Sequence, residues 1–299
     1  MNSFTIKDLE NLSGIKAHTI RIWEQRYSFL KPERTGTNIR TYSNDELKML
    51  LNIALLNKYG FKISHIDKMN REEIREKILS LNQSEAQQER IINELIKKMV
   101  DMDMDEFEAI LANYIMARGI ERCIVQILFP FLERIGILWL TNHINAAQEH
   151  LVTNIVRQKL IAGIEGVSPV FRTNKTVLLF LPDGEYHELG LLFMYYLLKS
   201  RGVKTIYLGC SVPLKDVEAV VKIKQPDYMY CHLTITGKYF NFDRFINALP
   251  TIFPGKPILI SGHLTHSYTK KIPASIQLKK SFAEAMDFVT GLQYRDDKR

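Results

Sequence analysis

A histidine flanked by an acid and a glycine stands in the segment GEYHELG, directly after the apolar run TVLLFL. Glu185 lies two residues before His187, and Gly190 lies three residues after it. A carboxylate at that spacing can hold one ring nitrogen of the imidazole, which fixes the tautomer and leaves the other nitrogen for a metal ion. The glycine removes a side chain where a large flat ligand could approach. These residues predict a ligand site, and the alternative is a solvated loop histidine.

A second group of residues with binding chemistry precedes this segment. Trp139 is followed, after nine residues, by Glu149 and His150. In one unbroken helix, eleven residues at about 100° each would bring Trp139 and His150 within roughly 20° of the same face. Asn142 and Asn145 favour a break, which would place the two on adjacent helices. Either geometry can aim both side chains at one ligand, whereas alone they would indicate a core tryptophan and a surface Glu-His pair.

The elements around GEYHELG predict an α/β domain over residues 173–299. Strand candidates alternate with helix candidates, and this order predicts a Rossmann-like, flavodoxin-like parallel sheet with helices on both faces. The strand candidates are TVLLFL, TIYLG, YMYCHL and PILISG, and the helix candidates are HELGLLFMYYLLKSRG, PLKDVEAVVKI and FDRFINAL. Such folds bind ligands at the carboxyl ends of their strands, where GEYHELG lies.

Residues 89–166 have helical periodicity in four amphipathic stretches, which predicts a four-helix bundle. The polar run NQSEAQQ interrupts the apolar pattern before it, so residues 79–88 are expected to form a linker.

Residues 1–78 have the pattern of a winged helix-turn-helix domain. Thr5 and Asp8 favour a helix start, Ser13-Gly14 a stop, KAHTIRIWEQRY a second helix, and KPERTGTNIRTY a basic hairpin. The second helix would enter the major groove and the hairpin would contact phosphates. A small helical domain with a solvated basic face is the alternative. The expected DNA contacts are His18, Thr19, Arg21, Arg34, Arg40 and Tyr42.

Two resemblances add to this interpretation. Residues from about 3 to 70 resemble the DNA-binding head of the MerR superfamily of transcription regulators. The matching residues are Thr19-Ile20-Arg21, Trp23-Glu24, Arg40 and Tyr42. The Glu-x-His-x-x-Gly pattern resembles the cobalamin-binding signature, usually written with Asp first, and this implies that His187 is the lower ligand of cobalt.

Trp, nine residues, then Glu-His resembles the CarH/LitR-type photoreceptor regulators, which join a MerR-type head to an adenosylcobalamin module. This resemblance spans nearly the whole chain and implies roles above the corrin. Trp139 would pack near the adenosyl group, Glu149 would belong to its pocket, and His150 would ligate cobalt after photolysis.

Cobalamin-binding sheets usually carry Ser-x-Leu and Gly-Gly around the slot for the nucleotide tail. The corresponding residues here are Cys231-His232-Leu233, with Ser261-Gly262 or Gly262-His263. The resemblance implies cofactor contacts from Cys231, Leu233 and Gly262, with a thiol in place of a hydroxyl and one glycine lost. A Cβ where backbone must approach a ligand can weaken binding.

Composition limits the remaining classes. The chain has 299 residues, enough for two or three domains, and a net charge of +7 that is spread over both ends. Its three cysteines are far apart, which fits a reducing cytoplasm and argues against a disulfide framework or a zinc site. No apolar run is long enough for a bilayer, and MNSFTIKDLE has no signal-peptide character.

The sequence thus predicts a cytoplasmic, homo-oligomeric (dimeric or tetrameric) transcriptional repressor rather than an enzyme. It would bind operator DNA, and the CarH/LitR-type resemblance implies that photolysis of bound adenosylcobalamin would change its oligomeric state and release the DNA. One alternative is a MerR-type regulator that no longer depends on cobalamin and is controlled by a protein partner or another ligand. The other is a corrinoid methyl-carrier or mutase subunit, which the DNA-binding head disfavours.

Overall fold

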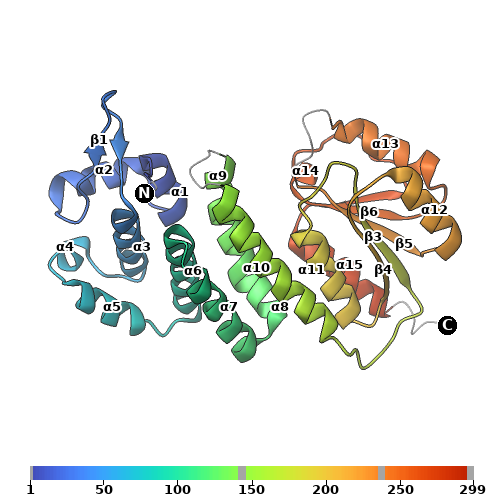
Figure 1. Ribbon diagram of the computed structural model, residues 1–299, viewed down its shortest axis with the longest axis horizontal. Coiled ribbons are helices and arrows are strands. Elements are labelled where there is room, and N and C mark those ends of the chain that lie inside the picture. Colours follow the sequence, from blue (N-terminus) through green and yellow to red (C-terminus); the bar gives the residue numbers. More distant parts are fainter. Residues whose placement is uncertain (1–2, 141–145, 235–239, 295–299) are drawn as a thin grey trace. The chain divides into compact units, whose positions relative to one another are not determined.

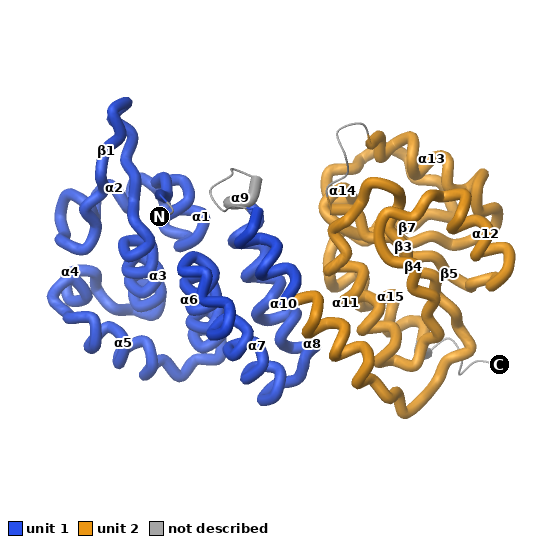
Figure 2. The backbone as a smooth tube through the Cα atoms, in the orientation of Figure 1, with its two compact units in different colours: residues 1–155 blue, residues 156–299 orange. Residues whose placement is uncertain are grey.

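The computed structural model describes residues 3–140, 146–234 and 240–294, without the side chains of 137–140 and 293–294 (Figure 1). The chain divides into two compact units, Met1–Ile155 and Val156–Arg299 (Figure 2). The boundary lies inside helix α10 (Ala146–Glu165), before the end of the predicted bundle at residue 166. No helix in the described ranges is long and apolar enough to cross a membrane.

The first unit begins with the predicted helix-turn-helix. Thr5 and Asp8 form a capping box at the start of α1 (Ile6–Ser13), and Gly14 ends the helix in the left-handed region at φ +73°. Helix α2 (Ala17–Arg26) buries Ile20 and Trp23, as its spacing predicts. A short antiparallel hairpin follows, formed by β1 (Glu33–Arg34) and β2 (Arg40–Thr41). These elements confirm the helix, turn, helix and hairpin order.

The next four helices of this unit follow the hairpin. Ser43 and Glu46 cap α3 (Asn44–Lys58) in the same reciprocal way. Helix α6 begins at Ser84, inside the segment predicted to be a linker, because Ala86 packs into the core while its polar neighbours face solvent. The helices are α3 (Asn44–Lys58), α4 (Ile63–Ile66), α5 (Arg71–Leu79) and α6 (Ser84–Asp101).

The four helical stretches expected after the head are present. They are α6, then α7 (Met104–Arg118), then the run α8 (Ile120–Cys123), η1 (Ile124–Leu128) and α9 (Phe129–Leu140), then α10. The η1 segment is a π-helical turn, which adds a residue to that turn of the third stretch. Phe107 packs on Phe131 with ring centroids 5.5 Å apart, and the buried Gln148 amide donates to the Met99 carbonyl at 3.2 Å.

The second unit contains a five-stranded parallel sheet in the order β4-β3-β5-β6-β7. The flavodoxin-like order and the first four strands confirm the predicted fold, while the last strand was not foreseen. The strands are β3 (Thr176–Pro182), β4 (Lys204–Val212), β5 (Tyr228–His232), β6 (Ile258–Ser261) and β7 (Ile276–Lys279). The two strands that follow β3 in the chain, β4 and β5, lie on opposite sides of it. The carboxyl end of β3 is therefore the switch point where such sheets bind ligands.

Helices cover both faces of the sheet (Figure 1). Helices α12 (Leu214–Lys224) and α13 (Phe242–Ile252) pack on one face through a large apolar cluster, here called the α12/α13 core. Helices α11 (Leu189–Ser200) and α15 (Phe282–Tyr294) meet through the stacked rings of Phe193 and Phe282. The four-residue helix α14 (His263–His266) follows β6.

Candidate cofactor site and DNA-binding surface

The loop after β3 is built around the carboxylate of Glu185, which is fully buried. Its Oε1 accepts hydrogen bonds from the His187 backbone N–H at 2.9 Å and from His187 Nδ1 at 2.6 Å. Its Oε2 accepts from the Thr234 backbone N–H at 2.9 Å, so one side chain joins the loops after β3 and β5. This Glu185 clamp lies at the switch point of the sheet.

Electrostatics favour the ionised form of Glu185. Burial alone raises the pKa of a carboxyl group, but the hydrogen bonds from the His187 ring, the His187 backbone and the Thr234 backbone outweigh it. The pKa of Glu185 is therefore below its usual range. An ionised carboxylate only accepts hydrogen bonds, so Nδ1 of His187 carries a proton and Nε2 is the nitrogen suited to a metal.

Neighbouring contacts position His187 further. The Ser211 backbone N–H, at the end of β4, donates to the Glu185 carbonyl at 3.1 Å. Glu188 begins α11 and pairs with Arg157 of α10, with Arg157 Nε 2.7 Å from its Oε1. The His187 side chain is 47 % exposed, so its ring is oriented through Nδ1 and reaches solvent.

The space over Gly190 is occupied by His232. A methyl group in place of the Gly190 hydrogen would overlap the imidazole of His232 at Nε2, Cδ2 and Cε1. His232 Nδ1 lies 2.8 Å from the Ser261 hydroxyl, which also forms a hydrogen bond with the Tyr230 hydroxyl. Gly190 was expected to make room for a flat ligand, and here it makes room for a side chain of the protein.

The other predicted slot residues have partners inside the sheet. Cys231 and Leu233 are completely buried in the α12/α13 core, and burial, aided by the charge of Glu185, raises the pKa of the Cys231 thiol well above its usual range. A side chain at Gly262, where φ is +100°, would overlap the Leu233 backbone. The structure therefore brings together Glu185, His187, Gly190, His232 and Ser261, and it places the Cys231 thiol in the core.

The residues expected above the corrin belong to the first unit. Glu149 is half-buried and His150 is exposed, both in the first turns of α10. The side chain of Trp139 lies outside the described residues. In the described part of the chain, no group of three or more His, Cys, Asp or Glu side chains could hold a metal ion.

Helix α2 and the hairpin present the expected DNA-binding surface. His18 and Arg21 are exposed on α2, and Thr19 Oγ1 lies 3.3 Å from His18 Nε2. Arg34 is exposed on β1, where a guanidinium N–H donates to Asn38 Oδ1 at 2.6 Å.

Unlike the exposed His18, Arg21 and Arg34, the side chains of Arg40 and Tyr42 both bind Glu24. Arg40 Nε donates to Glu24 Oε2 at 2.9 Å, and the buried Tyr42 hydroxyl donates to Glu24 Oε1. Burial and the hydrogen bond to Glu24 raise the pKa of Tyr42 well above its usual range. Tyr42 therefore holds the hairpin against α2, and its hydroxyl has a carboxylate partner where the sequence predicted a phosphate.

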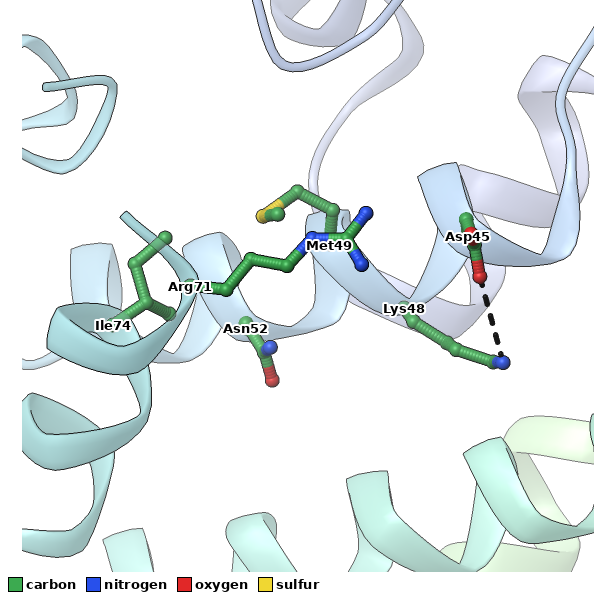
Figure 3. A pocket seen from close by; sticks show the side chains of 6 residues that line it. All are labelled: Asp45, Lys48, Met49, Asn52, Arg71 and Ile74. Carbon is green, nitrogen blue, oxygen red and sulfur yellow. Dashed lines mark ion pairs between the residues drawn. The ribbon is translucent and has the colours of Figure 1, made fainter. Parts of the chain in front are cut away.

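A cavity of about 140 Å³ lies in the first unit between α3 and α5 (Figure 3). Lys48 on its wall pairs with Asp45 at 3.7 Å and with Asp101 at 2.6 Å. Small-molecule sites have volumes of roughly 300–1,000 Å³, and none of the predicted cofactor residues lines this cavity. It is therefore separate from the candidate cofactor site.

The sequence patterns predicted no contacts for Ser211 and Thr234. They placed His232 and Ser261 only within the two motifs that correspond to the tail slot. The signal available for His232 was strand alternation: Tyr230 and His232 share one face of β5, and Met229 and Cys231 share the other.

Two regions of the chain match known families. Residues 4–73 match the family described as MerR HTH family regulatory protein, and residues 91–162 match the B12 binding domain family.

Curated relatives cover most of the chain. It is 26 % identical to the HTH-type transcriptional repressor CarH of Myxococcus xanthus, over 89 % of this chain and 91 % of the relative. It is 29 % identical to the HTH-type transcriptional repressor CarA of the same organism, over 74 % of this chain and 73 % of the relative. Both names describe repressors, which supports a regulator over an enzyme.

A solved structure shares the fold. The monomethylamine corrinoid protein of Methanosarcina barkeri superimposes with a TM-score of 0.50 at 13 % identity, over 68 % of this chain and 98 % of the other.

Proposed function

From the premise that this chain is a DNA-binding regulator joining a MerR-type helix-turn-helix region to a B12-binding domain, we propose that it is a light-responsive repressor with adenosylcobalamin as its cofactor. It acts in the cytoplasm as a homo-oligomer on operator DNA. Illumination changes its oligomeric state and releases the DNA. The Glu185 clamp is the observation that carries the proposal, because it presents an oriented imidazole at the ligand-binding edge of a flavodoxin-like sheet.

The donor set at this edge fits cobalt. His187 would hold the cobalt through Nε2, and Glu185 would keep the proton on Nδ1. Bound adenosylcobalamin would supply a light-sensitive cobalt–carbon bond. Trp139, Glu149 and His150 are carried over from the family resemblance as residues of the upper side. A light signal can shift assembly only if the two states differ in their contacts between subunits or between domains.

The first test is reconstitution of the purified full chain with adenosylcobalamin in darkness. The absorbance spectrum, the elution volume and binding to the upstream DNA of its own gene are measured before and after green light. We expect bound corrin, a spectral change, a change in elution volume and loss of DNA. A chain that retains no corrin, or whose elution and DNA binding ignore light, would refute the light-responsive function.

Histidine variants test the assigned roles. His187→Ala should weaken binding in the dark, because the lower ligand is lost. His150→Ala should leave dark binding largely intact and destabilise the illuminated form. His65→Ala, an exposed histidine on α4, is the matched control and should change neither. Equal effects of His150→Ala and His187→Ala in both states would contradict the two roles.

A second function is favoured by the position of His232. The chain would then be a MerR-type regulator that works without cobalamin, through a protein partner or another ligand. The imidazole over Gly190 supports it, because it occupies space beside the candidate lower ligand. Absence of corrin after reconstitution, together with specific DNA binding, would support this function over the first.

A further inference from the structure

A hydrogen-bonded array of three side chains lies on the α11 face of the sheet, beside His187. Tyr230 and His232 come from β5, Ser261 ends β6, and the Ser261 hydroxyl joins the other two. Burial lowers the pKa of His232 to about 4, although the charge of Glu185 opposes the shift. The ring is therefore neutral at physiological pH, and it is held in place by Ser261 and by packing on Gly190.

This array fills the space next to His187, the candidate cobalt ligand. Gly190 lies three residues after His187, in the first turn of α11, and a Cβ at this position would overlap the His232 ring. Filling the position over Gly190 requires removal of that ring. Two contacts restrain the backbone on either side: the Glu185 clamp holds the start of the loop, and the Ser261 carbonyl accepts a hydrogen bond from the Leu233 N–H at 2.8 Å.

The space over Gly190 matters because of the chemistry of cobalamin. Free cobalamin carries a nucleotide tail whose benzimidazole base ligates cobalt from the lower face. When a protein imidazole takes that position, the base is displaced but stays tethered on the lower side. A fused two-ring base then needs space beside the protein ligand. Corrinoids without the base need none.

We propose that His232 is a specificity-determining gate for the lower side of the corrinoid. With His232 bonded to Ser261 the chain accepts a tail-free corrinoid, and it accepts cobalamin only when His232 leaves Ser261 and turns away from Gly190. This inference rests on the proposed function, since it assumes that His187 ligates a corrinoid.

The test compares two probes, adenosylcobalamin and adenosylcobinamide, which lacks the nucleotide base. Their dissociation constants are measured in darkness by absorbance titration of the full chain. The wild type should bind adenosylcobinamide at least about tenfold more tightly. His232→Gly should tighten adenosylcobalamin binding by about tenfold and change adenosylcobinamide binding by less than about twofold, so the ratio falls towards one.

Two further variants keep the test decisive if His232→Gly does not fold. Ser261→Ala removes the tether of the ring and should lower the ratio in the same direction. His232→Phe keeps the space over Gly190 filled and should preserve the preference for the tail-free probe. His65→Ala, an exposed histidine on α4 of the first unit, is the control and should leave the ratio unchanged.

Each outcome decides between the two proposals. Equal binding of both probes to the wild type, or a ratio unchanged in His232→Gly and Ser261→Ala, overturns the gate and leaves the proposed function standing. Tighter binding of adenosylcobalamin to His232→Gly and Ser261→Ala than to the wild type, with adenosylcobinamide binding unchanged, supports the gate. Failure of every folded variant to bind either probe overturns both the proposed function and the gate.

Discussion

Replacing Glu185 by Gln isolates the clamp that organises the candidate site. The substitution keeps the shape of the side chain and removes its charge. Two donors from His187 meet one carboxylate oxygen, and the Thr234 N–H meets the other. A glutamine offers a single oxygen, so its amide group must face at least one N–H donor. The result is a lost charge-assisted hydrogen bond and a mismatched pair of buried donors.

The magnitude follows from this count. A hydrogen bond to a charged group contributes about 1.5–3 kcal/mol, and an unsatisfied buried polar group costs about 1–3 kcal/mol. Because Glu185 is fully buried, solvent does not screen the loss. The expected decrease in the free energy of unfolding of the second unit is about 2–4 kcal/mol. For a domain of this size, that corresponds to a fall in Tm of about 4–16 °C.

Calorimetry of the full chain measures this change, and the two tryptophans localise it. Trp23 and Trp139 both belong to Met1–Ile155, so tryptophan fluorescence follows the first unit. We expect the calorimetric transition of the second unit to shift more than the fluorescence transition. Glu218→Gln on α12 is the matched control. Its carboxylate pairs with Lys222 at the surface, so its loss should cost less than about 1 kcal/mol.

A shift for Glu185→Gln no larger than that for Glu218→Gln would refute the reasoning. It would mean that the three hydrogen bonds contribute no more than a solvated ion pair does.

Three other predictions use different parts of the chain. Between pH 6.5 and about 4, the unfolded state binds a proton that neutral His232 does not, so urea denaturation should show stability falling as pH falls, and His232→Phe should flatten this dependence. Arg21→Ala should weaken DNA binding and reduce its salt slope by about one without changing Tm, whereas Arg40→Ala should also lower Tm because it leaves a mostly buried carboxylate without its guanidinium partner; equal melting of the two variants would contradict this. Iodoacetamide should label the half-buried Cys210 before Cys123, since burial raises the pKa of Cys123 to about 12, as peptide mass mapping of the native protein can check.

The sequence predicted the sheet best where strands are continuous apolar runs. TVLLFL and PILISG are buried on both faces, and the structure confirms them as β3 and β6. Strand β7 was not predicted because its sequence, IQLK, buries only Ile276 and gives no apolar run. Helix α6 begins earlier than expected because a single small residue, Ala86, supplies the buried contact in a polar stretch.

The sequence predicted the contact between Glu185 and His187 at the candidate site. It did not predict the direction in which the surrounding side chains point. The spacing of Glu185 and His187 was sufficient to predict their hydrogen bond, because both lie in one loop. The partner of Gly190 comes from a strand more than forty residues later. Alternation predicts that Cys231 and His232 face opposite ways, but only the packing of the helices decides which face is which. The same limit applies to Tyr42, because the strand before it, β2, has only two residues and gives no alternation from which its direction could be predicted.

The contact of Glu24 with Arg40 and Tyr42 bears on the thermodynamics of DNA recognition. It ties the hairpin to the helix expected in the major groove while the protein is free. Ordering a mobile arm at an interface costs about 0.5–1.5 kcal/mol for each immobilised side chain, and this cost is subtracted from the affinity. A hairpin already held by α2 incurs less of that entropy loss when DNA arrives. The distance between the two contact regions is also set in advance, so operators whose groove geometry does not match it would be disfavoured.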